Sequence, residues 1–100
     1  MRDRLELSKK LHTICDHIYF QPGSNTTMAY PCIRYEFNGP FDMKADNGNF
    51  VTYGRYSIIN IYKSPTSKLF DALRETFKYI TWDRQYLADG LYHDVYTLYF

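Results

Sequence analysis

The sequence predicts an α+β domain in which a mainly antiparallel β-sheet carries two helices packed on one face. Apolar residues recur at helical spacing in two stretches, 4–17 and 65–79. Runs that alternate in polarity, or that are rich in β-branched and aromatic residues, occupy much of the remaining chain. The predicted order is helix, two or three strands, helix and two strands, which suits helices on one side of an antiparallel sheet.

The first predicted element is a helix over residues 4–17. Asp3 is the expected N-cap, and Glu6 follows it at capping-box spacing. One face of this helix is apolar, with residues at helical intervals: Leu7, Leu11, Ile14 and Ile18. The next segment, 21–31, carries two prolines, a glycine and small polar residues, and is expected to be an extended loop.

Two strands and a long loop are predicted next. CIRYEF, 32–37, alternates, with Ile33, Tyr35 and Phe37 on one side and Arg34 and Glu36 on the other. Residues 38–50 contain two Asn-Gly dipeptides and a proline, which indicates a protruding loop and a candidate binding element. VTYGRYSIINIY, 51–62, is the strongest strand signal and is expected in the middle of the sheet.

A second helix and a hairpin complete the predicted fold. Ser64 followed by Pro65 is typical of a helix start, with the serine as cap. An apolar stripe then runs through 65–79 and just beyond it: Leu69, Phe70, Leu73, Phe77 and Ile80. Two strands, 81–87 and 91–100, flank a turn at Asp89-Gly90.

Composition bounds the size of the protein and the kind of contact it makes. A chain of 100 residues supports one core, so residues 1–100 are expected to form a single domain. Aromatic residues make up 19% of the chain, with 11 Tyr and 7 Phe, more than one small core usually uses. Tyrosine is favoured at protein interfaces, so this excess indicates protein contacts, although the preference of strands for aromatic residues is an alternative explanation.

Charge and cysteine usage exclude several classes. The net charge of +1 offers no evident source for the phosphate neutralisation that drives non-specific nucleic-acid binding. Four basic residues near the N-terminus, Arg2, Arg4, Lys9 and Lys10, are interrupted by Asp3 and Glu6, as is typical of a solvated helix face. Cys15 and Cys32 form no CxxC pair, which argues against a metal knuckle and a disulfide scaffold and fits a reducing cytoplasm. No signal-like segment or membrane-length apolar run is seen.

The sequence offers no convincing catalytic or metal-binding set. His93 and Asp94 are adjacent in a predicted strand, so their side chains should point to opposite faces and cannot easily orient each other. His12 could share a helix face with Cys15 or Asp16, but these residues make a poor zinc site. No phosphate-binding glycine loop or nucleophile elbow occurs. We therefore predict no enzyme, no cofactor and no metal. Trp82 could stack on a base or a sugar, but we expect it to anchor a helix to the sheet.

Three stretches, 18–35, 44–65 and 82–100, together resemble small neck and tail-completion proteins of tailed bacteriophages, most closely the tail terminator type. The specific marks are YFQP at 19–22, YPCI at 30–33, ADN at 45–47, RY at 55–56 and DRQYLADGLYHDVYTLYF at 83–100. This chain departs from the family pattern at Gly23, where a second proline is common, at Asp89-Gly90, where Asp-Asn is usual, and in the weaker match of 63–80.

The resemblance implies a structural virion protein of the phage neck, assembled in the host cytoplasm. Tail terminators form a sixfold ring on the last ring of tail-tube subunits, stop tube growth and meet the head-side connector. The implied partners are other copies of this chain, the tail-tube protein and a head-completion or connector protein, with no membrane, and with DNA at most passing through the ring without sequence-specific binding. A head-closure or adaptor protein of the same neck is the near alternative, and a small intracellular binding module is the alternative from a different class.

A ring requires one patch on each subunit to dock on a different patch of its neighbour. We expect the final strand, Val95–Phe100, to lie near the surface between subunits and the loop Asn38–Phe50 to reach axially to the tail tube. The interface candidates are Phe41, Lys44, Asp46, Asn47, Phe50, Tyr86, Tyr96, Tyr99 and Phe100. His93 and Asp94 are then hydrogen-bonding residues of the last hairpin.

Overall fold

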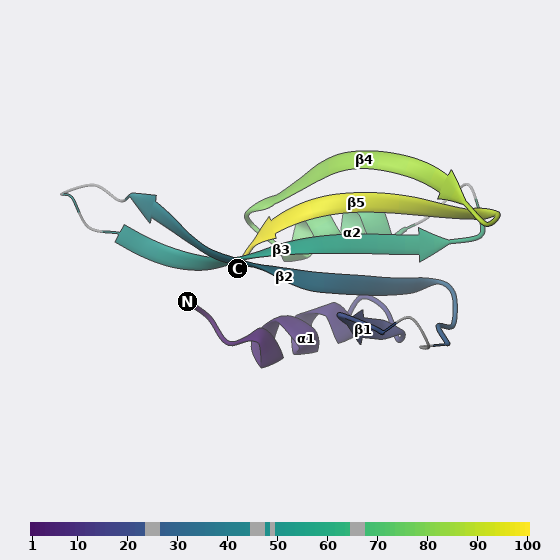
Figure 1. Cartoon of the computed structure of the whole chain (residues 1–100), viewed down its shortest axis with the longest axis horizontal. Helices are drawn as coiled ribbons and strands as arrows, with labels where there is room; N and C mark the ends of the chain where they lie inside the picture. Colours follow the sequence, from purple (N-terminus) through teal and green to yellow (C-terminus); the bar gives the residue numbers. More distant parts are fainter. Residues whose placement is uncertain (24–26, 45–47, 49, 65–67) are drawn as a thin grey trace.

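The computed structural model describes residues 1–23, 27–44, 48, 50–64 and 68–100. Its elements, in chain order, are α1 (Arg4–His12), β1 (Ile18–Phe20), β2 (Cys32–Lys44), β3 (Phe50–Tyr62), α2 (Leu69–Thr76), β4 (Ile80–Ala88) and β5 (Leu91–Tyr99) (Figure 1). The predicted α+β class is confirmed. Among the described residues, no helix combines the length and the apolar character needed to cross a membrane.

The strands form one sheet in the order β1-β2-β3-β5-β4. The pairs β2–β3, β3–β5 and β5–β4 are antiparallel, and only the short β1 runs parallel to its neighbour β2. The prediction of a mainly antiparallel sheet is therefore confirmed, and β3 lies at its centre as expected. The sequence analysis did not identify β1, because three residues are too few for a periodic signal.

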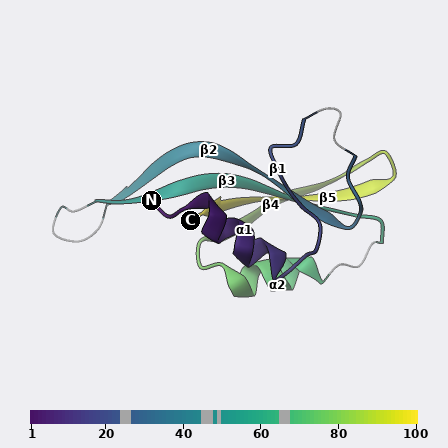
Figure 2. The ribbon, with the colours of Figure 1, turned by 90° about the horizontal axis from the view of Figure 1, so that it is seen from below.

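Both helices lie on the same side of the sheet, as predicted (Figure 2). Leu7 and Leu11 of α1 share one buried cluster with Leu73 of α2. The sheet contributes alternate residues to this cluster: Ile33, Tyr35, Tyr56, Ile58, Tyr96 and Leu98. Because side chains of a strand alternate between the two faces, Arg34 and Glu36 point away from the helices, and they form an ion pair of 2.8 Å.

Helix α1 begins as predicted but ends early. The Asp3 carboxylate accepts a hydrogen bond of 3.0 Å from the Leu5 amide, which satisfies one of the unpaired amides of the first turn. The helix ends at His12 and not at residue 17. The chain then leads into β1, and the His17 carbonyl accepts a bond of 2.9 Å from the Ile33 amide at the start of the parallel pairing of β1 with β2.

The prediction of a long loop over residues 38–50 is wrong. β2 continues to Lys44 and β3 starts at Phe50, and the two strands remain in register from Pro40↔Gly54 to Lys44↔Phe50. A register shift between Phe37 and Pro40 is a β-bulge, at which Gly39 adopts φ 97°. We call residues 38–44 and 50–54 the hairpin arm, which extends beyond the rest of the sheet (Figure 1).

The second helix is shorter than the predicted 65–79. It spans Leu69–Thr76, with Lys68 at the N-cap position and no side-chain cap, so the expected Ser64 cap is wrong. The expected first helical residue, Pro65, lies outside the described residues. The helix ends where Phe77 becomes extended, with φ −114°, and the chain turns into β4.

The final hairpin agrees with its prediction. β4 and β5 are joined at Asp89 and Gly90, which adopt φ 54° and 74°. Two consecutive positive φ values define a type I′ turn, whose twist matches that of antiparallel strands. The position of the hairpin in the sheet, however, was not predicted: β5 pairs with both β3 and β4, so it is an inner strand and β4 forms the edge.

Candidate protein interface

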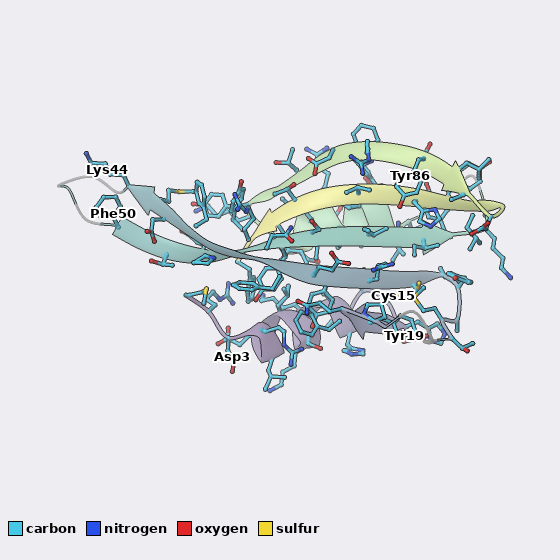
Figure 3. All side chains as sticks on the ribbon, in the orientation of Figure 1. Asp3, Cys15, Tyr19, Lys44, Phe50 and Tyr86 are labelled. Carbon is cyan, nitrogen blue, oxygen red and sulfur yellow. The ribbon has the colours of Figure 1, made fainter. Side chains whose placement is uncertain are left out.

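Apart from Met1, Leu5 and Phe37, the exposed large apolar side chains of the described residues lie at two separate places in the molecule. The first is strand β4, where Trp82, Tyr86 and Leu87 are exposed. The second is the end of the hairpin arm, where Phe50 and Val51 are exposed. Figure 3 shows Phe50 and Lys44 at the far end of the arm and Tyr86 on β4, on a different part of the sheet.

Strand β4 lies outside the layer of helices. Trp82 pairs with Tyr96 of β5 and therefore faces the same side of the sheet, yet Tyr96 is 0% exposed and Trp82 is 45% exposed. Leu87, at the other end of the strand, pairs with Tyr92 on this same side of the sheet and is 64% exposed. The buried residues of the core thus end at β5, and Ile80 at the start of β4 packs against them. The expectation that Trp82 anchors a helix to the sheet is wrong for this reason.

Aromatic contacts hold the base of the arm to the body of the protein. The rings of Phe41 and Tyr99 lie 4.8 Å apart between centroids, and those of Tyr53 and Tyr79 lie 5.5 Å apart. Gly54 is buried at this junction, and a Cβ there would lie 2.7 Å from the Tyr56 ring. The base is therefore tightly packed, whereas the end of the arm is exposed.

The predicted interface residues separate into groups with different surroundings. Lys44 and Phe50 are exposed and directly opposite each other in the arm, and Tyr86 is exposed on β4. Phe41 and Tyr99 are half-buried against each other at the arm base.

The remaining four candidates are not available to a partner in this structure or cannot be placed. Tyr96 and Phe100, 0% and 4% exposed, lie in the core of the subunit, where a second protein cannot reach them. Tyr96 and Phe100 are therefore corrected as interface candidates, whereas the expectation for the rest of the final strand stays a prediction. Asp46 and Asn47 lie outside the described residues.

The structure also adds Trp82, Leu87 and Val51, which the sequence analysis did not select. All three lie in stretches correctly predicted as strands, and their apolar type alone suggests burial. Their exposure depends on which strand lies at the sheet edge and on where the helices end, and these are long-range properties that no local pattern reveals.

His93 and Asp94 face opposite sides of β5, as predicted. Asp94 is buried and accepts a hydrogen bond of 2.9 Å from the Tyr62 hydroxyl, which in turn accepts one of 2.8 Å from Gln85 Nε2. His93 stacks on Tyr86 with ring centroids 4.6 Å apart, on the side away from the helices. The histidine and the aspartate therefore cannot act on one substrate atom as a pair.

The two cysteines are free and buried, and Cys32 does not have the character of a nucleophile. Burial raises the pKa of the Cys32 thiol to about 11, and the nearby Cys15 acts in the same direction. A thiol with a raised pKa is protonated at neutral pH and unreactive. A cleft of about 550 Å³ lies beside Cys15 at the end of α1. In the described part of the chain, no group of three or more metal-binding side chains occurs.

Comparison of the chain with protein-family models and with curated proteins found no match.

Proposed function

We propose that this chain is a structural virion protein of a tailed-phage neck, a tail terminator that forms a ring on top of the tail tube and joins it to the head-side connector. The observation that carries the proposal is the presence of two different exposed apolar surfaces, on β4 and at the end of the arm. A heterologous interface requires two such surfaces on every subunit. The subunits close into a ring when a whole number of the rotations between neighbours makes up a full turn.

The resemblance of residues 18–35, 44–65 and 82–100 to phage neck proteins supplies the biological setting. A terminator needs lateral contacts to its neighbours and axial contacts to the tube below and the connector above. In this proposal the protein acts through its contacts with neighbouring proteins. The polar pair His93 and Asp94, which could have indicated chemistry, has a structural role in its strand.

The proposal is tested by locating the chain in particles. Virions or tails are purified, and the protein is placed by cryo-electron microscopy with its copies counted around the axis. Six copies that cap the tail tube are the expected result. Copies one layer nearer the portal would assign the protein to head closure or to an adaptor, and its absence from particles would overturn a virion role.

Absence from particles would leave the small intracellular binding module as the class to test. The salt dependence of binding then distinguishes two kinds of partner. Binding by phosphate neutralisation weakens by orders of magnitude between low and moderate salt, whereas binding through exposed aromatic and aliphatic side chains depends on salt only weakly.

A further inference from the structure

The outer edge of β4 carries a row of backbone groups that are not paired with another strand. Among the described residues β4 pairs with β5 alone, so its other side carries amides and carbonyls without strand partners. Residues 81–87 are all exposed. An open edge of this kind accepts another strand readily unless charges, a proline or a bulge protect it. β4 has one bulge, between Trp82 and Arg84, and its charged residues Asp83 and Arg84 lie at that bulge. The stretch 85–88 that follows is regular and carries no charge or proline.

The hairpin arm carries a second open edge, on β3. The pairing of β3 with β5 begins at Arg55↔Tyr99, and the Phe100 amide and carbonyl bond to Gly54 at 2.8 and 3.0 Å. Beyond this point, residues 50–53 pair with β2 and, in the described part of the chain, with no strand on their other side. Their sequence, Phe-Val-Thr-Tyr, consists of strong strand formers and contains no charge or proline.

The two edges of the arm are unlike each other. The β2 edge carries Pro40, which has no amide hydrogen, a bulge beside it, and the charged residues Asp42 and Lys44. These are the features with which proteins protect an edge against pairing. The β3 edge has none of them and carries the exposed Phe50 and Val51. Of the two, the β3 edge is therefore the one suited to receive a strand.

Within one molecule these two open edges do not meet, because the arm leaves the sheet at the end opposite the β4–β5 turn (Figure 1). We infer that β4 of one copy of this chain pairs with residues 50–53 of the arm of the next copy, so that the sheet continues from subunit to subunit. This contact covers Leu87 and Val51 together and pairs the free backbone groups of residues 50–53 with part of the β4 edge. The inference rests on the proposed function, since it assigns the lateral contact of the ring.

A symmetric pairing of β4 with β4 is the competing arrangement between copies. It would leave Phe50 and Val51 exposed, and its two-fold symmetry would close at a dimer. A helix docked on β4 would leave the backbone groups of the edge unpaired. The arm offers both exposed apolar side chains and backbone groups without a strand partner, so it can match β4 in both respects.

Cysteine cross-linking between two variants tests the inference. Leu87→Cys and Val51→Cys each replace an exposed residue, and are prepared with tags of different size. They are mixed at high protein concentration and treated with a short bifunctional maleimide. We expect the mixed dimer to form several-fold more than either homodimer. Trp82→Cys provides a second probe on β4, and circular dichroism verifies that every variant is folded.

Two controls define the background of the cross-linking. The wild-type chain reports any reaction of the buried Cys15 and Cys32. His12→Cys places an exposed cysteine on α1, away from both edges, and should cross-link to Val51→Cys only at the background level. A predominant homodimer of Leu87→Cys would overturn the inference in favour of symmetric pairing. Mixed cross-linking no greater than that of the controls, with both β4 probes, would also overturn it.

Cross-linking tests the contact between β4 and the arm, and the location of the chain in particles tests the neck role, so the two proposals can fail separately. Mixed cross-links from a chain that is absent from phage particles would support the contact and refute the neck role. Six copies in the neck with no contact between β4 and a neighbouring arm would support the neck role and refute the contact.

Discussion

His93 and Asp94 are neighbours in the chain, but their side chains lie on opposite faces of the sheet. Asp94 is held by the Tyr62 hydroxyl at 2.9 Å on the helix-covered face, and His93 stacks on Tyr86 at 4.6 Å on the other face. The alternation of a strand imposes this separation. Each residue therefore makes its contacts in a different part of the last hairpin.

Removal of the Tyr62 hydroxyl should destabilise the protein. Tyr62→Phe deprives the buried Asp94 carboxylate of its donor, so we expect the free energy of unfolding, measured by urea denaturation, to fall by about 1–3 kcal/mol. Tyr96→Phe is the matched control, because the buried Tyr96 hydroxyl has no hydrogen-bond partner among the described residues and its loss should cost little. Equal losses for both variants would show that the Tyr62–Asp94 bond contributes nothing specific.

The turn between β4 and β5 should depend on glycine at position 90. Gly90 has φ 74°, a conformation that costs an L-residue about 1–2 kcal/mol, so Gly90→Ala should lower stability to urea by that amount. Gly23→Ala serves as control: at both positions an added Cβ would meet no atom within 4 Å, but only Gly90 has a positive φ. A similar effect of both changes would contradict a backbone origin.

Stability should fall in alkaline solution because of Cys32. Burial raises the pKa of this thiol from its ordinary 9.0 to about 11, so the folded chain holds the proton more tightly than the unfolded chain. This contribution is complete below pH about 9 and is lost as the pH rises toward 11. Burial also raises the pKa values of Tyr56, Tyr62 and Tyr96, which adds a loss of the same sign above pH about 10.

The measurement is a set of urea midpoints between pH 8 and about 10, before the tyrosines contribute strongly. In Cys32→Ala the midpoint should decline less with pH than in the wild type. An unchanged decline would assign the alkaline loss to other groups.

Exposed apolar residues on β4 should contribute little to the stability of one subunit. Trp82→Lys and Leu87→Lys should each change the free energy of unfolding by no more than about 0.5 kcal/mol, because neither side chain belongs to the core. The same changes should lower self-association, measured by analytical ultracentrifugation at high protein concentration. A loss of more than about 2 kcal/mol for Trp82→Lys would show instead that this residue does anchor the core.

The N-cap of α1 provides a test of local structure. Asp3→Ala removes the hydrogen bond of 3.0 Å to the Leu5 amide and should cost about 1 kcal/mol in thermal or urea unfolding. Asp16→Ala removes an exposed carboxylate that follows the helix and should be neutral. A neutral Asp3→Ala would indicate that the first turn gains nothing from its cap.

The errors in the sequence-based prediction have a common cause. The Asn38-Gly39 dipeptide by itself favours a turn, but the long-range pairing of β2 with β3 places Gly39 in a β-bulge. Ser64-Pro65 resembled a helix start, yet packing places the N-cap at Lys68. In each case a local preference gave way to a tertiary contact.

The features that depend on neighbouring residues could be predicted without the fold: the apolar stripes of both helices, the alternation of residues 32–37, the turn at Asp89-Gly90 and the separation of His93 from Asp94. These follow from the periods of helix and strand and from the conformational freedom of glycine. The strand order, in which β5 is an inner strand and β4 an edge, and with it the burial of Tyr96 and the exposure of Trp82, could be read from the three-dimensional fold alone. Strand order is set by pairing between distant segments, and the surfaces available to a partner depend on that order.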